Sequence, residues 1–327
     1  MAAVGRQPRL LVLRALGVGD LLTGVPALRA LADGFPNHRR TLACPQELAP
    51  LVLLTGAVDA VADASGPVRP RVDAAPEVAV DLHGRGPESH RALLELAPRR
   101  LIAFACPAAG VERGPAWAED EHEVHRWCRL LGESGIPADR SRIDLDPPPI
   151  RVPEPLRGLT IVHPGAAAGA RRWPQERFAA VARAQVAEGR RVVLTGGRRE
   201  RELAAEVARL AGLPSGAVLA GRTGLRDLAA LVAAAERVVC GDTGMAHLAT
   251  AFRTPSVVLF GPVSPERWGP PPDRPWHRAL WAGRRGDPHA AAVDPGLLSI
   301  GVDDVLDALA GLPAADAQDA VGAASPG

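Results

Sequence analysis

The segment 238–249, VVCGDTGMAHLA, contains the groups of this chain best suited to binding an anion. An apolar run leads through the turn Gly-Asp-Thr-Gly into a stretch with helical spacing. The N–H groups of Thr243, Gly244 and Met245 would converge there with the helix dipole. A diphosphate is the kind of anion that such a helix start holds.

Asp242 and His247 flank this helix start, and both also have a plain structural interpretation. Asp and Thr are frequent helix caps, so Asp242 and Thr243 could serve only to begin the helix. A lone His one turn into a helix is commonly half-buried and hydrogen-bonded. The local sequence gives the capping and the ligand-binding interpretations equal weight.

Three other turns in the same half of the chain place glycine after an apolar run: HPG at 163–165, TGG at 195–197 and FGP at 260–262. In open α/β sheets, ligands bind at the carboxyl ends of the strands, where such turns expose N–H groups. One glycine there is an ordinary turn residue, but four such turns on one rim favour a ligand site. We therefore expect Gly165, Thr195 and Gly196 to belong to the same site.

Two adjacent arginines, Arg171 and Arg172, follow the first of these turns. Pro174 lies two residues after Arg172 and suits the first turn of a helix. Paired guanidiniums just ahead of it could clamp phosphate oxygens through charged hydrogen bonds. The alternative interpretation is a solvated basic corner.

Asp20 is the candidate for acid–base chemistry in the first half of the chain. It closes the turn Gly-Val-Gly-Asp at 17–20, shortly after the apolar run 10–13. If that strand end faces a ligand, the carboxylate could accept a proton from an attacking hydroxyl. Helix capping is the equally weighted alternative. We expect Thr23 to cap the helix that follows, with Pro26 in its first turn.

Short apolar runs alternate with segments of helical spacing, which predicts parallel sheets flanked by helices. A proline-rich stretch at about 145–157 interrupts the alternation and indicates a linker between two doubly wound α/β halves. The expected strands are 10–13, 41–43, 57–61, 78–82, 101–104, 159–162, 192–194, 218–220, 238–240 and 257–260. Further helices are expected near 47–54, 88–96, 120–134 and 303–309.

Length and charge exclude several classes of protein. The 327 residues, 47% of them hydrophobic, suffice for two domains with full cores. The 38 basic residues nearly balance 37 acidic ones, leaving a net charge of +1, so nucleic acid is not an expected partner. The sequence has no Lys, so every basic side chain other than His is Arg.

The cysteines, Cys44, Cys106, Cys128 and Cys240, are far apart, which favours reduced thiols over a zinc cluster or a redox pair. The sequence HEVH at 122–125 lacks the H-E-x-x-H spacing of a zinc motif and favours a solvated helix face. No apolar run reaches the ~18–20 residues that cross a bilayer. The N-terminus also lacks the apolar stretch of a signal peptide. We therefore expect a cytoplasmic location.

A series of motifs follow one another in order: LGVGDLLTGVP at 16–26, VDLHG at 80–84, HPGA at 163–166, RRWP at 171–174, LTGG at 194–197, GDTGMAHLA at 241–249 and TPSVVLFGP at 254–262. In type and order they resemble those of glycosyltransferase family 9, the ADP-heptose:lipopolysaccharide heptosyltransferases. The resemblance extends from about residue 9 to residue 312, nearly the whole chain.

The resemblance implies a GT-B fold, in which two Rossmann-like, doubly wound parallel-sheet domains face each other across a cleft. Residues 1–150 would form the acceptor-binding domain, and residues 151–312 would bind the nucleotide-sugar donor. Residues 313–327 carry no apolar periodicity and are expected to be disordered.

The implied activity is inverting transfer of a heptose or a related sugar, from an ADP-heptose-like donor to a saccharide or glycolipid acceptor such as the lipopolysaccharide core. Asp20 would be the general base, and Arg171 would neutralise the leaving diphosphate. No metal or cofactor is implied, because helix N-termini and basic side chains stabilise the leaving group. A glycolipid acceptor would bring a transient membrane contact.

The implied donor site consists of Gly165, Arg171, Arg172, Thr195, Gly196, Asp242, Thr243, Gly244, Met245 and His247, and Gly19 and Thr23 would lie on the acceptor side. The chain departs from the family's pattern at two positions. Arg171 stands where Lys is common, and Arg226 stands where an acidic residue is common, with Asp227 one place later.

Two rival interpretations stay open. A nucleotide-sugar epimerase on the same scaffold would alter the donor sugar without an acceptor. A non-catalytic nucleotide-sugar binding protein would keep the fold but would have no use for a base at the position of Asp20.

Overall fold

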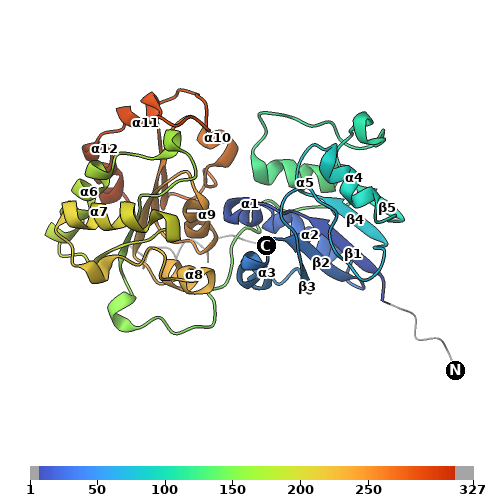
Figure 1. The fold of residues 1–327 in the computed structure, drawn as a ribbon, viewed down its shortest axis with the longest axis horizontal. Helices are drawn as coiled ribbons and strands as arrows, with labels where there is room; N and C mark the ends of the chain where they lie inside the picture. The colour runs from blue at the N-terminus through green and yellow to red at the C-terminus, as the bar shows by residue number, and fades with distance from the viewer. Residues whose placement is uncertain (1–6, 314–327) are drawn as a thin grey trace. The chain divides into compact units, whose positions relative to one another are not determined.

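The chain divides into two compact units, the first ending at Leu145 and the second beginning at Asp146. The computed structural model describes residues 7–313. The division falls at the start of the proline-rich stretch, where fixed φ angles and missing N–H groups prevent helices and sheets from forming. Figure 1 shows the two units, the first in blue to green and the second in green to red.

The first unit is built on a five-stranded parallel sheet in the order β3-β2-β1-β4-β5. Its strands are β1 (Arg9–Leu13), β2 (Arg39–Cys44), β3 (Ala60–Asp63), β4 (Val78–Asp81) and β5 (Arg100–Ile102). In the register of β1, Leu13 lies between Ala43 of β2 and Asp81 of β4. The segments that leave β1 and β4 therefore emerge side by side at the carboxyl edge of the sheet.

The helices of this unit are α1 (Val18–Thr23), α2 (Val25–Gly34), α3 (Ala49–Leu54), α4 (Glu88–Leu94) and α5 (Glu123–Glu133), with short 3₁₀ turns η1 (Gln46–Leu48) and η2 (Pro107–Ala109). In α5, Val124, Trp127 and Leu131 form a buried stripe at helical spacing. The ring of His122 accepts a hydrogen bond from the N–H of Val124 at 3.2 Å and so caps the helix. The solvated face expected at 122–125 is confirmed only in part, since His125 is exposed but Glu123 and Val124 are buried.

The structure also corrects the expected start of α2. The turn expected at 17–20 is the first turn of a helix, in which Gly17 is the N-cap of α1. Thr23 ends α1 and does not cap α2, whose N-cap is Gly24. The reason is that the Thr23 hydroxyl bonds back to the carbonyl of Gly19 at 3.0 Å, one helical turn earlier.

Two strands of the first unit are displaced from their expected positions. The strand expected at 57–61 is β3, which begins at Ala60. The strand expected at 101–104 is β5, which ends at Ile102. Beyond Ile102 the N–H of Ala105 bonds to the carbonyl of Pro115 at 2.9 Å, so the chain has left the sheet.

The second unit repeats the design with the strand order β10-β9-β8-β6-β7, again all parallel. Its strands are β6 (Thr160–His163), β7 (Val192–Leu194), β8 (Arg237–Gly241), β9 (Ser256–Phe260) and β10 (His277–Trp281). Its helices are α6 (Gln175–Ala187), α7 (Arg201–Ala211), α8 (Leu225–Ala233), α9 (Gly244–Ala251), α10 (Pro265–Trp268), α11 (Pro295–Ser299) and α12 (Val302–Ala310), with 3₁₀ turns η3 (Glu154–Leu156), η4 (Gly169–Arg171), η5 (Arg198–Glu200) and η6 (Ser215–Ala217).

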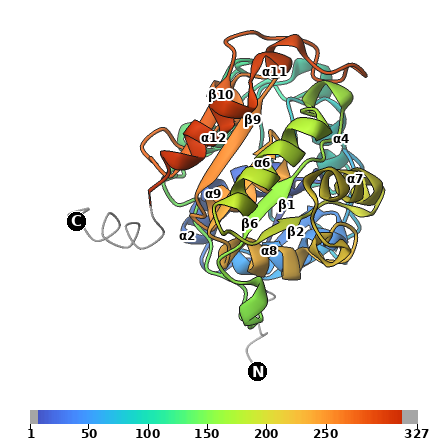
Figure 2. The ribbon, with the colours of Figure 1, turned by 90° about the vertical axis from the view of Figure 1, so that its left-hand side faces the viewer.

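The main core of the second unit lies between its sheet and the helices α6, α7 and α12. Figure 2 shows α6 and α12 side by side in front of β6 and β9. The indole N–H of Trp173 donates to the carbonyl of Ile300 at 3.0 Å, and its ring meets Phe178 edge to face. This contact joins the start of α6 to the segment before α12, and so holds the loop just before Trp173 in place.

Two expectations fail in this unit. The strand expected at 218–220 is a single bridge between Val218 and Leu194, and Gly221 follows with a left-handed φ of +69°. The strand β10 was not expected, because its sequence HRALW is only half apolar and it lies at the edge of the sheet. The tail expected from 313 onward lies, apart from its first residue, outside the described residues.

Candidate active site

Asp242 and Arg171 meet at the start of α9, in the middle of the second unit. Asp242 directly follows β8, is only 6% exposed, and has its carboxylate Oδ2 3.6 Å from Nη1 of Arg171. The same Nη1 lies 3.4 Å from the backbone oxygen of Asp242. Burial raises the pKa of the Asp242 carboxyl, and the nearby guanidinium only partly offsets that effect.

Close backbone packing places Arg171 there. A Cβ on Gly169 would lie 1.8 Å from the carbonyl oxygen of Ala291, so only glycine fits at the start of η4. A Cβ on Gly241 would lie 3.2 Å from the backbone oxygen of Arg171. Neither glycine was singled out from the sequence as a positioning residue, because the contacts that require them come from distant segments.

Arg171 and Arg172 do not form a matched clamp. Nε of Arg172 donates to the carbonyl of Ala166 at 2.9 Å, and the side chain is exposed. Nε of Arg171 is buried and has no hydrogen-bond partner. A buried guanidinium N–H without a partner is costly, and an anion at this point would supply the missing acceptor.

The start of α9 has features of both helix capping and anion binding, the two interpretations of its sequence. Thr243 is the N-cap, and its hydroxyl accepts from the N–H of Met245 at 3.3 Å. The expected free N–H of Met245 is therefore already used. Asp242 is no cap, since its carboxylate faces Arg171. His247 is 8% exposed, and its ring lies 5.8 Å from that of Trp268 on α10.

The turns after β6 and β7 emerge beside this helix start, because β6 lies between β7 and β8. Thr195 is fully buried, with its hydroxyl 3.1 Å from Nδ1 of His163. Burial lowers the pKa of the His163 imidazole, and Glu200 only partly opposes that shift. A Cβ on Gly165 would lie 2.0 Å from the Glu200 carboxylate, so that carboxylate occupies the space above Gly165.

Glu200 lies at the edge of the candidate site and was not among the residues predicted from the sequence. Its carboxylate accepts from the N–H of Gly197 at 2.7 Å and so begins η5. Gly196 is close to Glu200 as well, since a Cβ on Gly196 would lie 3.1 Å from Cβ of Glu200. The available signal was the Glu three residues after the glycine, which is the spacing of a capping box.

In the first unit, Asp20 is the third residue of α1, and its side chain is 27% exposed. Oδ2 accepts from the N–H of Gly17 at 3.2 Å, so the carboxylate does cap the helix. Oδ1 lies 3.9 Å from Nη2 of the fully buried Arg14. Thr23 is buried, and its hydroxyl accepts from Arg14 at 3.0 Å, which leaves it engaged inside the unit.

His83 adds a second polar group at this edge. Its Nδ1 accepts from the N–H of Ala15 at 3.2 Å, which joins the end of β4 to the end of β1. Burial lowers the pKa of its imidazole, although the Asp81 and Asp20 carboxylates act the other way. In the sequence His83 is visible only as part of VDLHG, because adjacency in the sheet, and not spacing, brings it close to Asp20.

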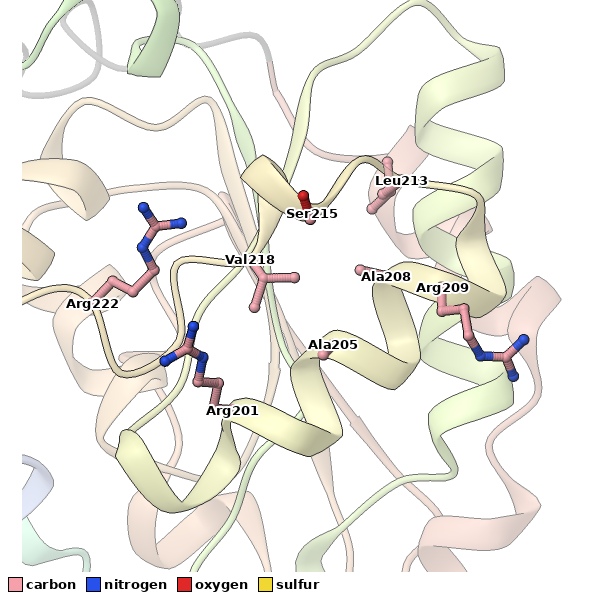
Figure 3. A pocket seen from close by; sticks show the side chains of 8 residues that line it. All are labelled: Arg201, Ala205, Ala208, Arg209, Leu213, Ser215, Val218 and Arg222. Atoms are coloured by element: carbon pink, nitrogen blue, oxygen red, sulfur yellow. The ribbon is translucent and has the colours of Figure 1, made fainter.

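A surface cavity of about 370 Å³ lies elsewhere in the second unit, between α7 and the segment that leads to Arg222. Figure 3 shows its wall of small apolar side chains, among them Ala205 and Val218, with Arg201 reaching in from the first turn of α7. None of the eight residues that line this cavity belongs to the site predicted from the sequence.

Within the described residues, 7–313, no helix is long and apolar enough to cross a membrane. In the same range, no three His, Cys, Asp or Glu side chains gather in an arrangement suited to a metal ion.

Comparison with known proteins adds a family match. The sequence model of glycosyltransferase family 9 (heptosyltransferase) matches residues 115–286, more than half of the chain. Lipopolysaccharide heptosyltransferase 2 of Salmonella typhimurium is 39% identical over 109 residues, which are 32% of this chain and 31% of that protein. Lipopolysaccharide heptosyltransferase 1 of Pseudomonas aeruginosa is 31% identical over 154 residues, which are 46% of this chain and 42% of that protein. The chain thus spans about a third of the length of the first curated relatives it matches.

Solved structures match over almost the whole chain. The ADP-heptose lipopolysaccharide heptosyltransferase II of E. coli has a TM-score of 0.72 at 22% identity, covering 92% of this chain and 97% of that one. The E. coli heptosyltransferase WaaC with ADP has a TM-score of 0.70 at 17% identity, covering 92% of this chain and 99% of that one. At such identities the likeness concerns the fold, and it confirms the expected GT-B fold of two α/β units.

Proposed function

Because the chain belongs to glycosyltransferase family 9, we propose that it is an inverting glycosyltransferase of the heptosyltransferase type. It transfers a heptose or related sugar from an ADP-heptose-like donor to a saccharide or glycolipid acceptor, such as a lipopolysaccharide core. The names of the matched relatives, all lipopolysaccharide or lipooligosaccharide heptosyltransferases, support this substrate class.

One observation carries the proposal. The buried Nε of Arg171 has no partner, and the same guanidinium lies 3.6 Å from Asp242 at the N-terminus of α9. A positive side chain and a helix N-terminus at one point are the two elements that bind phosphate without a metal. The diphosphate of the donor is the anion that this arrangement fits.

The donor half of the reaction follows from that geometry. Arg171 and the N–H of Gly244 stabilise the negative charge that grows on the diphosphate as its bond to the anomeric carbon breaks. Gly165, Thr195 and Gly196 border the same edge of the sheet. Glu200 fills the space above Gly165 and Thr195 is fully buried, so we assign these residues to shaping the turns beside the donor.

The acceptor half of the reaction belongs to Asp20. Its carboxylate takes the proton of the acceptor hydroxyl while the hydroxyl oxygen bonds to the anomeric carbon. The bond to the diphosphate breaks on the opposite face of the sugar, so the configuration inverts. Asp20 retains the proton, and the nucleoside diphosphate leaves as an anion. We further propose that the enzyme is cytoplasmic and needs no metal. It contacts the membrane only through a glycolipid acceptor.

Replacing the proposed base tests this function. Asp20→Asn keeps the size of the side chain but removes the proton acceptor, so we expect turnover to fall by at least about 100-fold. Binding of ADP, measured by calorimetry, should change by less than about 2-fold, since Asp20 belongs to the other unit. Asp33→Asn, on the exposed end of α2, is the matched control and should keep full turnover.

The donor and the reaction type need separate measurements. Thermal shifts with ADP-, GDP-, UDP- and dTDP-sugars identify the nucleotide, because a bound donor stabilises the folded state. Product analysis without an acceptor then distinguishes a glycosyltransferase from a nucleotide-sugar epimerase. A changed donor sugar in that mixture would show an epimerase, and an unchanged one supports the transferase.

A further inference from the structure

Arg14 is a fully buried charged residue that the proposed mechanism does not use. It directly follows β1, and its exposed fraction is 0%. Burying a guanidinium is costly unless its N–H groups find partners. The partners of Arg14 therefore indicate why a charge is kept at this position.

Those partners come from three separate elements. Nε donates to the backbone oxygen of Asp20, Nη1 donates to the carbonyl of Leu82, and Nη2 donates to the hydroxyl of Thr23 at 3.0 Å. Nη2 also lies 3.5 Å from the carboxylate of Glu123 on α5. The rigid, planar guanidinium thus ties α1 to the end of β4 and to α5.

The same guanidinium faces the carboxylate of Asp20 directly. Nη2 lies 3.9 Å from Oδ1, while the other carboxylate oxygen accepts from the N–H of Gly17. Arg14 therefore bonds to the backbone of Asp20 and lies at ion-pair distance from its carboxylate. Within the described residues, no other arginine is paired with this carboxylate.

A second buried arginine provides a matched comparison. Arg126 is 3% exposed, binds the same Glu123 carboxylate, and stacks on Trp117 at 4.2 Å. Arg14 stacks on Trp127 at 4.8 Å. The two arginines share burial, a carboxylate partner and an indole, but the bonds of Arg126 go to backbone oxygens at 118, 119 and 121 and none goes to α1.

We propose that Arg14 is a positioning residue that holds the Asp20 carboxylate in its reactive orientation. This inference rests on the proposed function, in which Asp20 is the general base. Arg14 touches neither reactant; it acts by fixing the first turn of α1, and Glu123 fixes Arg14 in turn. Proton transfer depends on orientation, and a displacement of about 1 Å can cost about 100-fold in rate.

Gly24 allows the geometry to be disturbed without removing a charge. A Cβ at this position would lie 3.1 Å from both Cδ and Nε of Arg14, and 3.2 Å from the backbone oxygen of Leu21. The φ of Gly24 is −84°, which any residue adopts, so Gly24→Ala presses on the Arg14 side chain and on the last turn of α1 without straining its own backbone.

The test compares four variants of the full chain, Arg14→Met, Arg14→Lys, Arg126→Met and Gly24→Ala, by kcat, donor KM and Tm. We expect Arg14→Met to lower kcat about 100-fold with donor KM changed less than about 2-fold. Arg14→Lys, which keeps the charge, should restore kcat to within about 10-fold of the parent. Gly24→Ala should lower kcat by about 5-fold or more.

Arg126→Met separates positioning from simple loss of stability. Removing either buried arginine leaves Glu123 partly unpaired, so both methionine variants should lose roughly 5–15 °C in Tm. Only the Arg14 variant should lose kcat; Arg126→Met should stay within about 3-fold of the parent.

Several results would overturn the inference. Equal losses of kcat in the two methionine variants would show that only the stability of the unit matters. If Arg14→Met does not fold, Gly24→Ala decides, because normal kcat in that variant contradicts the positioning role. Low turnover in Asp20→Asn with normal turnover in Arg14→Met overturns this inference alone, whereas normal turnover in Asp20→Asn overturns the proposed function and this inference together.

Discussion

Arg171 and Arg172 are neighbours in the sequence but have different surroundings in the fold. The side chain of Arg172 is anchored to the carbonyl of Ala166 and is exposed. The side chain of Arg171 points to Asp242 and has a buried N–H without a partner. At the scale of single residues, the two arginines should therefore respond differently to the same substitution.

Arg171→Met should raise the Kd for ADP and lower kcat/KM for the donor by about 10- to 100-fold, because a charged hydrogen bond to phosphate contributes roughly 1.5–3 kcal/mol. Arg172→Met removes the same charge one residue away and should change both quantities by less than about 3-fold. Calorimetry with ADP and initial rates measure them. Equal losses in the two variants would contradict the role given to Arg171.

Gly165 is a second residue with a specific steric role. Gly165→Ala would press a methyl group against the Glu200 carboxylate, which lies 2.0 Å from that position. We expect a loss of about 1–3 kcal/mol in the free energy of unfolding. Gly216→Ala is the control, since nothing lies within 4 Å of its Cβ position. Denaturant titration of both variants checks the difference, and equal stability would show that Glu200 moves aside freely.

At the scale of elements, β10 shows how an edge strand can be held by a buried polar contact. Nδ1 of His277 lies 2.8 Å from the hydroxyl of Ser256 on β9, and the ring is 7% exposed. Burial, helped by the positive charge of Arg274, lowers the pKa of His277 to about 3. The imidazole is therefore neutral in the folded protein over most of the pH range.

This shift predicts how stability depends on pH. Because the folded pKa is depressed, the contribution of His277 is fully present above its ordinary pKa near 6.5 and is lost as pH falls toward 3. The loss should approach about 1.4 kcal/mol per pH unit in that window. His277→Gln should remove this part of the slope, as measured by urea unfolding from pH 7.5 to 4.5. His289→Gln, on the exposed surface, should keep the parent slope.

Element positions followed from the sequence where apolar runs were strong. The expected strands at 10–13, 192–194 and 257–260 lie within the observed β1, β7 and β9. The strand predicted at 218–220 does not form. An apolar run there has the pattern of a buried strand, but the backbone makes only one bridge to a neighbouring strand. The first turn of α1 was missed because Gly-Val-Gly-Asp resembles a loop until the capping bond of Asp20 closes it.

At the scale of the whole molecule, the two units divide the proposed roles between them. The residues proposed to bind the donor lie in the second unit, and the proposed base Asp20 lies in the first. The donor product should therefore act on one unit only. With ADP at 100 times its Kd, the folded state gains about 2.7 kcal/mol.

Hydrogen exchange of the intact chain with and without ADP checks this division. Amides at 165–172, 195–197 and 241–247 should gain protection, while those at 15–24 should not. If only the segment 15–24, which contains Asp20, gained protection, the nucleotide would bind to the first unit, and the division of roles would be contradicted. Adding EDTA should leave the pattern unchanged, as expected of binding that needs no metal.

The sequence by itself determined the fold class and the family and indicated the candidate chemical groups, because apolar alternation and short motifs are local properties of the chain. It identified Asp20, Arg171 and Asp242 without their partners. Only the tertiary structure decided that Arg171 differs from Arg172, that Glu200 fills the space above Gly165, and that Arg14 grips the start of α1. These contacts join segments far apart in the chain, and no spacing rule encodes a contact that depends on which strands are neighbours in the sheet.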